Sequence, residues 1–404
     1  MAFNGLRGTL PQTIGLLQPA PRQDLMHSAR HQDLHDVPGA LRAFDVLTPG
    51  RVNLIGEHTD YNDGFVLPMA IDRGLRLTVR PRADRRVLFR SERQTAAAVF
   101  DLDVPLVPAG AWSDYPAGVL AEFLQLGWQI PGFEAHVSGD LPSGGGLSSS
   151  AALEVATATA VETLCRRTLP LDAKALLCQR AENCFAGVPC GIMDQFAVTC
   201  GQAGHALLLD CRNRAIRHVL IDDASIRVLV VDSGVKHSLG DGEYGKRRAQ
   251  CASAAALLGC ASLRDVTPAI WQAEADRLPD IERRRAAHVL SENARTLAFV
   301  AAVEATDWPR AGRLMGESHA SLARDYEVSC PEMERLVAAA ADLPGVHGCR
   351  MTGGGFGGCA VALVVADRAD AVMADLRRAY RDATGIEAEM FVTRAAAGPR
   401  VVPA

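Results

Sequence analysis

The fold is decided by residues 141–152, which read Leu-Pro-Ser-Gly-Gly-Gly-Leu-Ser-Ser-Ser-Ala-Ala, with an Ala-rich run up to Cys165 directly after them. Three glycines permit positive φ angles and a close approach of the backbone to a ligand, and the alanines favour a helix. The stretch therefore predicts a loop that opens a helix. The free N–H groups and the dipole of a helix N-terminus attract a phosphate group.

The common nucleotide-binding motifs do not fit this stretch. No Lys-Ser/Thr pair follows the glycines, and their spacing does not match G-x-G-x-x-G. The serines could cap the helix or reach a metal ion. A capped helix after a glycine turn therefore remains an alternative, and the phosphate-loop interpretation needs support from the rest of the chain.

Length and composition indicate a globular protein of two domains. A chain of 404 residues is too long for one ordinary core, and 48% hydrophobic with 22% charged residues excludes a disordered chain. A net charge of −5 gives no indication of a nucleic-acid partner. The 11 cysteines form no C-x-x-C pair, and no apolar run reaches the roughly 18 residues that span a bilayer. We therefore expect a reduced, cytoplasmic protein with no membrane partner.

The order of the predicted elements divides the chain into three parts. Residues 1–40 show no sustained period and are interpreted as a loose N-terminal extension. Residues 41–222 mix short strand-like runs with helices, and they form the predicted sugar- and phosphate-binding domain. Residues 223–404 are helical at first and end with alternating strands and helices, which predicts a second, C-terminal α+β domain.

A long polar connection at 48–64 lies between the strand-like runs 44–47 and 66–71. Such loops inside compact domains are more often functional than not. Its side chains could hold the several hydroxyls of a sugar, and further candidates follow later in the chain. The candidates are Arg51, Glu57, His58, Asp60, Glu182, Asp194 and Tyr244.

Each candidate has a structural alternative. Arg51 and Glu57 could form an ion pair that fixes their own loop, and Asp194 could cap a helix. Glu182 could face solvent, and Tyr244 could be an ordinary core or surface aromatic residue. The second glycine loop, 353–358, could be only a turn leading into a strand.

Three motifs resemble those of a known family, the galactokinases. Residues 49–64 resemble the galactokinase signature in almost every position. Residues 142–152 resemble the phosphate loop of the wider superfamily of galacto-, homoserine, mevalonate and phosphomevalonate (GHMP) kinases, and 351–358 resemble its third motif. The resemblance extends over residues 48–392. It implies an α+β, two-domain GHMP-kinase-like fold with the active site in the cleft between the domains.

The resemblance also implies a role for each candidate. Asp194 would be the catalytic base, and Arg51 would stabilise the transition state. Ser150 and Glu182 would hold Mg²⁺, the implied cofactor, with ATP as co-substrate. Galactose would be bound by Glu57, His58, Thr59, Asp60 and Tyr244. The ATP phosphates would be bound by Gly144, Gly145, Gly146, Leu147, Ser148, Ser149 and Ser150.

The expected reaction is the transfer of the γ-phosphate of ATP to the 1-hydroxyl of α-D-galactose. Phosphoryl transfer needs bound phosphates, a metal ion, a nearby cation and a group that accepts the alcohol proton, and the candidates supply all of these. Two alternatives remain open: a kinase for a related sugar such as N-acetylgalactosamine or arabinose, and a non-catalytic galactose sensor. The intact serines of 148–152 favour the enzyme. We expect a monomer.

Overall fold

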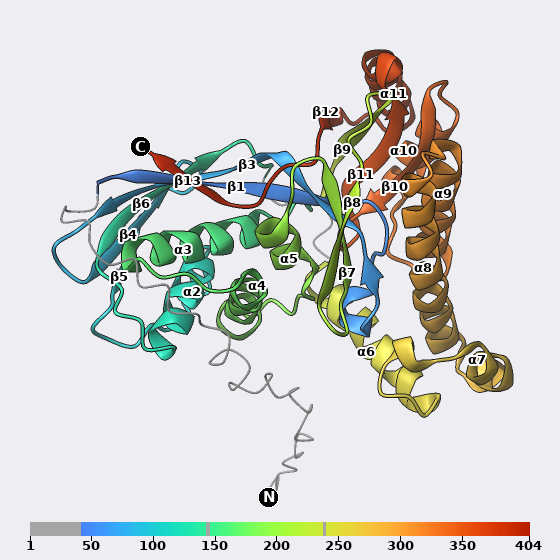
Figure 1. Cartoon of the computed structure of the whole chain (residues 1–404). Coiled ribbons are helices and arrows are strands. Elements are labelled where there is room, and N and C mark those ends of the chain that lie inside the picture. The colour runs from blue at the N-terminus through green and yellow to red at the C-terminus, as the bar shows by residue number, and fades with distance from the viewer. Residues whose placement is uncertain (1–41, 143–145, 237–239) are drawn as a thin grey trace, which may run out of the picture.

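The computed structural model describes residues 42–142, 146–236 and 240–404. The predicted extension and the candidates Gly144 and Gly145 lie outside the described residues. The chain forms two lobes side by side, each built on a sheet with helices packed against it (Figure 1). In the described part of the chain, no helix is both long enough and apolar enough to cross a bilayer.

The first lobe contains a six-stranded sheet in the order β13-β1-β3-β6-β4-β5. Neighbouring strands are antiparallel, except for the parallel pair β4 and β6. Four helices cover one face of this sheet (Figure 1). The strands are β1 (Phe44–Asn53), β3 (Pro68–Pro81), β4 (Arg86–Ser91), β5 (Ala98–Asp101), β6 (Phe133–Gly139) and β13 (Arg400–Pro403); the helices are α2 (Asp114–Gln125), α3 (Ser149–Cys165), α4 (Leu171–Arg180) and α5 (Met193–Cys200).

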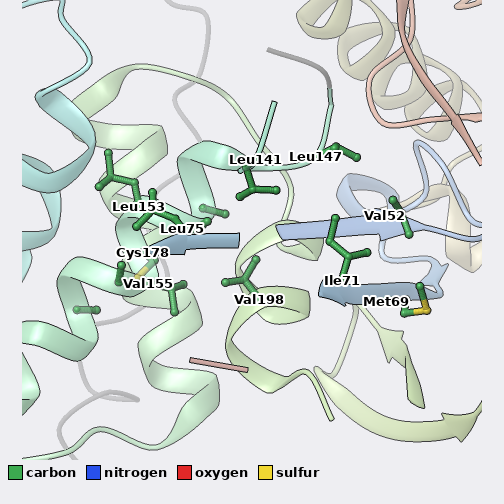
Figure 2. Close-up of a cluster of buried hydrophobic side chains, with 14 of the residues drawn as sticks. Val52, Met69, Ile71, Leu75, Leu141, Leu147, Leu153, Val155, Cys178 and Val198 are labelled. Atoms are coloured by element: carbon green, nitrogen blue, oxygen red, sulfur yellow. The ribbon is translucent and has the colours of Figure 1, made fainter. Parts of the chain in front are cut away.

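Helix α3 is the centre of the first lobe. Almost all of its side chains are buried, because it packs on β1 and β3 on one side and on α2, α4 and α5 on the others. Its many Ala and Thr side chains are small enough for these neighbours to approach closely. Figure 2 shows this core, where Leu153 and Val155 of α3 lie among side chains from β1, β3 and the other helices. The helix predicted after the glycine loop is therefore confirmed.

The second lobe contains an antiparallel sheet in the order β10-β11-β9-β12. Its central strands are buried on both faces: Val228 and Val230 of β9 join the core shared with the first lobe, whereas Leu229 and Val231 join a second core. The strands are β9 (Ile226–Lys236), β10 (Val346–Thr352), β11 (Gly357–Val365) and β12 (Glu389–Thr393); the helices are α6 (Gly240–Leu257), α7 (Pro268–Glu274), α8 (Asp280–Glu304), α9 (Trp308–Arg324), α10 (Pro331–Ala341) and α11 (Ala369–Thr384).

Smaller elements connect the lobes. A three-stranded sheet contains β2 (Phe65–Val66), β7 (His205–Asp210) and β8 (Ala215–Leu220). A π-helical segment, η2 (Ala181–Ala186), continues α4, and short 3₁₀ turns are η1 (Asp60–Asn62), η3 (Leu263–Asp265), η4 (Ala275–Arg277) and η5 (Ala366–Arg368).

The structure differs from the sequence predictions in three places. β1 extends through Asn53, so the first part of the predicted connection 48–64 is a strand, and its residues 51–53 pair with residues 68–70 of β3. The helix predicted for 171–185 changes to π-helical geometry at Ala181. The last strand, β13, leaves the second lobe and pairs with β1, so the predicted division at residue 222 does not hold for residues 400–403.

Candidate active site

Arg51 reaches the centre of the molecule because β1 changes register just before it. The pairing of β1 with β3 shifts between Pro49 and Arg51, and such a bulge redirects the side chain that follows it. A Cβ atom on Gly50 would lie 2.3 Å from Leu141 Cδ2 and 2.9 Å from the Leu147 carbonyl oxygen. Only glycine therefore lets the phosphate loop approach β1, and the Arg51 N–H donates to the Leu147 carbonyl at 3.2 Å.

Arg51 and Asp194 form a bidentate ion pair. Arg51 Nε donates to Asp194 Oδ1 at 2.8 Å, and Nη2 donates to Oδ2 at 2.6 Å. The remaining nitrogen, Nη1, donates to the carbonyl oxygen of Gly146 in the phosphate loop. The Ser148 hydroxyl also donates to Asp194 Oδ2. The structure thus brings together four predicted site residues from β1, α5 and the glycine loop. Asp194 binds the side chains of Arg51 and Ser148 instead of capping its helix.

The phosphate loop has strained geometry where it enters α3. Ser148 has φ 57° and ψ 50°, the left-handed conformation that a non-glycine residue adopts only where its surroundings fix it. Its side chain makes no capping bond to α3. Because the Ser148 hydroxyl donates to Asp194, it does not cap α3, a helix of 17 residues. The N–H groups of the first turn of α3 therefore receive no hydrogen bond from this side chain.

Glu182 lies on the π-helical segment, a geometry frequent at functional sites. Its carboxylate accepts a hydrogen bond from Gln195 Nε2 at 2.5 Å and one from the Cys190 thiol at 3.5 Å. Burial and the neighbouring charge of Asp194 raise the pKa of Glu182 to about 7, and a hydrogen bond with Ser150 opposes this shift. The structure therefore brings the two predicted metal ligands, Ser150 and Glu182, together next to Asp194.

These two residues fit a magnesium ion chemically. Mg²⁺ prefers oxygen ligands and is usually held by one or two protein groups together with phosphate oxygens and water. Behind Glu182, Gln195 Nε2 also donates to Glu154 Oε2 at 3.0 Å, whereas Glu154 Oε1 has no hydrogen-bond partner within the described ranges. Burial and the charge of Glu182 raise the pKa of Glu154 well above its ordinary range, so the Glu154 carboxyl keeps its proton while no cation is bound. A bound cation would favour the charged carboxylate of Glu182.

Asp60, His58 and Tyr244 form a cluster near Asp194. Burial and the charge of Asp194 raise the pKa of Asp60 to about 6. The ring centroids of His58 and Tyr244 are 5.7 Å apart, although His58 belongs to the loop after β1 and Tyr244 to α6 of the second lobe. These three predicted sugar-binding residues are thus brought close to the predicted base.

The side chains of Glu57 and Thr59, two other predicted sugar-binding residues, have partners within the protein. Glu57 Oε2 lies 2.7 Å from Arg350 Nη2, and its Oε1 accepts hydrogen bonds from the Thr352 hydroxyl and the Gly353 N–H. The Thr59 hydroxyl lies 2.8 Å from the Gly56 carbonyl oxygen and 2.7 Å from that of Phe65. Both side chains are buried and fix the loop itself, so their direct contact with a substrate stays a prediction.

A cavity of about 510 Å³ opens beside the Arg51–Asp194 pair. The sequence analysis did not identify the side chains that line its outer part, Trp112, Tyr115 and Arg93. Trp112 and Tyr115 follow a largely apolar connection, 102–111, so no contrast in the local sequence distinguished them. The cavity is lined on its inner side by Arg51, Asp194 and residues Gly146 to Ser150.

Comparison with known families and structures agrees with this geometry. Residues 114–202 match the GHMP kinases N terminal domain, and residues 299–382 match the GHMP kinases C terminal family. The fold is shared with the mevalonate kinase of Methanococcus jannaschii, which is 19% identical with a TM-score of 0.63 over 89% of this chain and all of that one. The two-lobed fold and these family matches therefore define a GHMP-type kinase.

The remaining matches identify one family within this class of kinases. Residues 37–81 match the galactokinase galactose-binding signature. The chain is 45% identical to the Bos taurus galactokinase over 94% of its length and 97% of that protein, and 45% identical to the Homo sapiens galactokinase over 90% and 93%. A crystal structure of Lactococcus lactis galactokinase complexed with galactose is 33% identical, with a TM-score of 0.85 over 89% of this chain and 95% of that one. The chain belongs to the galactokinase family and is an ATP-dependent sugar kinase.

Proposed function

We propose that this kinase transfers the γ-phosphate of ATP to the anomeric hydroxyl of α-D-galactose, giving α-D-galactose 1-phosphate and ADP. The observation that carries the proposal is the bidentate pair of Arg51 and Asp194, which lies between the phosphate loop and the cluster of His58, Asp60 and Tyr244. The galactose bound to the Lactococcus lactis relative supports the choice of sugar.

In this proposal Asp194 accepts the proton of the sugar hydroxyl. An anomeric hydroxyl is more acidic than an ordinary alcohol, so a carboxylate is an adequate base. Arg51 lies within hydrogen-bond distance of both carboxylate oxygens, which fixes the direction from which the carboxylate meets the substrate. The same guanidinium lies against the phosphate loop through Gly146 and stabilises negative charge that develops on the transferring group.

The cavity beside this pair accommodates the nucleotide. Its inner wall offers the phosphate loop and the uncapped start of α3, and its outer wall offers the rings of Trp112 and Tyr115 against a flat base. Ser150 and Glu182 would hold Mg²⁺, which, when bound, neutralises charge on the β- and γ-phosphates. Asp60, His58 and Tyr244 would hold the sugar hydroxyls, and Glu57 and Thr59 would support them through the loop.

The test is ADP release with magnesium and ATP over a panel of galactose, glucose, N-acetylgalactosamine, arabinose and mevalonate. We expect turnover on galactose above all others, and a strongly reduced kcat with Asp194→Asn. Preferential turnover on another sugar would keep the kinase and overturn the substrate. No turnover despite galactose binding, measured by calorimetry, would favour a galactose sensor. That the protein is a monomer stays a prediction, which light scattering can test.

A further inference from the structure

His58 is held in an unusual backbone conformation. Its φ of 63° is left-handed, a conformation that costs free energy for a residue with a side chain and persists where the surroundings impose it. The carbonyl oxygen of His58 accepts a hydrogen bond from Asn62 Nδ2 at 2.8 Å, and the preceding carbonyl lies 3.1 Å from His288 Nε2 of α8. The two lobes together therefore determine where the imidazole ring points.

A chain of hydrogen bonds begins at this ring and crosses into the second lobe. His58 Nδ1 lies 2.8 Å from the Tyr61 hydroxyl, and this hydroxyl lies 2.8 Å from that of Tyr326. The Tyr326 hydroxyl lies 3.0 Å from the Cys251 thiol of α6. Tyr326 and Cys251 are fully buried, so water does not compete for these bonds.

All four groups in this chain are neutral. Burial and the neighbouring cationic groups lower the pKa of His58 to about 3, so the ring carries a single proton. Burial raises the pKa values of Tyr61 and Tyr326 and brings that of Cys251 to about 11, so each keeps its proton. The question is therefore which ring nitrogen of His58 carries the hydrogen.

The donor and acceptor strengths in the hydrogen bond between Tyr61 and His58 Nδ1 decide which ring nitrogen carries the hydrogen. A phenol is a better donor than a neutral imidazole N–H, and an imidazole nitrogen is a better acceptor than a phenol oxygen. Tyr61 accordingly donates to Nδ1, Tyr326 donates to Tyr61, and the Cys251 thiol donates to Tyr326. Nδ1 then has no hydrogen of its own, and the single ring proton is on Nε2.

Nε2 is the end of the chain that points to substrate. It is buried and makes no hydrogen bond of normal geometry in the part of the chain that the structure describes, although the backbone of Gly354 interacts with the ring. A buried polar atom of this kind normally has a partner, so this one is available to a ligand beside Tyr244. We propose that Tyr61 and Tyr326 are positioning residues that hold His58 Nδ1 and thereby present the Nε2–H group to a hydroxyl of the sugar. This inference rests on the proposed role of His58 in sugar binding.

The first test uses Tyr326→Phe, which keeps the ring, whose centroid lies 4.7 Å from that of His58, and removes only the hydroxyl. We expect the KM for galactose to rise about fivefold, the size of one neutral hydrogen bond, with kcat and the KM for ATP changed less than about twofold. The matched control is Tyr380→Phe, which removes an equally buried hydroxyl that donates to the Ser233 carbonyl outside this chain. A Tyr326→Phe effect that falls equally on kcat and both KM values would overturn the proposal.

The second test reads the proton position directly. In ¹⁵N-histidine-labelled enzyme, the imidazole ¹⁵N shifts should show His58 as the Nε2–H tautomer, and Tyr61→Phe should weaken that preference while Tyr380→Phe should not. The Nδ1–H tautomer in the unmodified protein would overturn the proposal.

A third comparison separates this inference from the proposed function. In a His58→Gln background, which keeps a side-chain N–H donor but has no Nδ1, Tyr326→Phe should no longer change the KM for galactose. If His58→Ala leaves that KM unchanged, His58 does not bind the sugar, and the proposed role fails together with this inference. If His58→Ala raises the KM and Tyr326→Phe does not, only this inference is wrong.

Discussion

The carboxylate of Asp60 lies directly against the backbone of Gly191, so that a Cβ atom at position 191 would stand 1.7 Å from Asp60 Oδ2. No side chain fits in that distance, and Asp60 itself is surrounded by Asp194 and by the backbone of Met193. The turn before α5 is therefore shaped to receive a carboxylate from the loop after β1. Two stretches that are 131 residues apart in the sequence, 60 to 191, thus form one wall of the site.

Substituting Gly191 by Ala should therefore displace Asp60. We expect the KM for galactose to rise and the free energy of unfolding to fall by about 1–3 kcal/mol, the usual cost of overpacking. The matched control is Gly316→Ala on α9, where an added Cβ meets nothing within 4 Å. Sugar kinetics and urea unfolding measure the two effects, and equal behaviour of the two variants would contradict the predicted contact.

Substituting Asp194 by Asn should reduce kcat by at least about 100-fold, because the amide cannot accept the proton of the sugar hydroxyl. ATP binding should persist, since the phosphate loop and the aromatic wall of the cavity are unchanged. A coupled ADP assay and nucleotide titration by fluorescence give both quantities. If kcat stayed within tenfold of normal, Asp194 would orient the substrate without acting as the base.

The raised pKa of Asp60 predicts a stability effect that depends on pH. Because the pKa is about 6 in the folded protein and lower in the unfolded chain, the folded state binds the proton more tightly between these values. Asp60 therefore destabilises the fold by the full amount above about pH 6, and this cost shrinks as the pH falls toward the pKa of the unfolded chain. We expect Asp60→Asn to raise Tm at about pH 8 and to lose most of that advantage by about pH 4. An advantage of equal size at both pH values would show that Asp60 does not titrate there.

The ion pair of Glu57 and Arg350 should be important for stability, since both side chains are almost completely buried. Arg350→Met leaves the Glu57 carboxylate buried without its cation and should cost about 3–5 kcal/mol in urea unfolding. The double variant with Glu57→Gln should recover most of that loss. Arg378→Met, at an exposed pair with Asp375, is the control and should cost less than about 1 kcal/mol. A double variant no more stable than the single one would argue against a pairwise effect.

Glu182→Gln should raise the magnesium concentration needed for half-maximal activity by about tenfold, and the KM for galactose should stay the same. The amide is a weaker ligand than the carboxylate but has nearly the same shape. Glu122→Gln, which alters a carboxylate paired with Arg180 on the same lobe, serves as the control. An unchanged magnesium requirement would remove Glu182 from the set of metal ligands.

The local sequence predicted those elements whose structure depends on neighbouring residues. The glycine loop and α3 were predicted from glycine and alanine content. The helical character of the chain after residue 240 was also predicted, and Pro268, Pro309 and Pro331 each lie in a first helical turn, where proline is favoured. The bulge that redirects Arg51 was not predicted, because it depends on pairing with β3. The π-helical geometry at Glu182 also escaped prediction, since no local pattern distinguishes it from an α-helix.

The site residues were likewise predicted where a local motif identifies them. The identities of Arg51, Asp194, Ser150 and Glu182 were available from motifs, and the structure brings them together. Tyr61, Tyr326 and Arg350 were not identified, because their contacts form only where the two lobes meet. Gly191 was not identified, because its partner Asp60 lies 131 positions earlier in the same lobe. The orientation of the Glu57 side chain was not predicted either, because its ion-pair partner, Arg350, lies 293 positions later in the sequence.

The pairing of β13 with β1 has a consequence for how the protein is made. Without β13, one edge of the first sheet would expose the unpaired backbone groups of β1. During synthesis this edge stays uncovered until residues 400–403 emerge, after the whole second lobe has been translated. The first lobe is therefore completed last although it is made first, and a fragment cut at the boundary between the lobes would retain a strand edge available for aggregation.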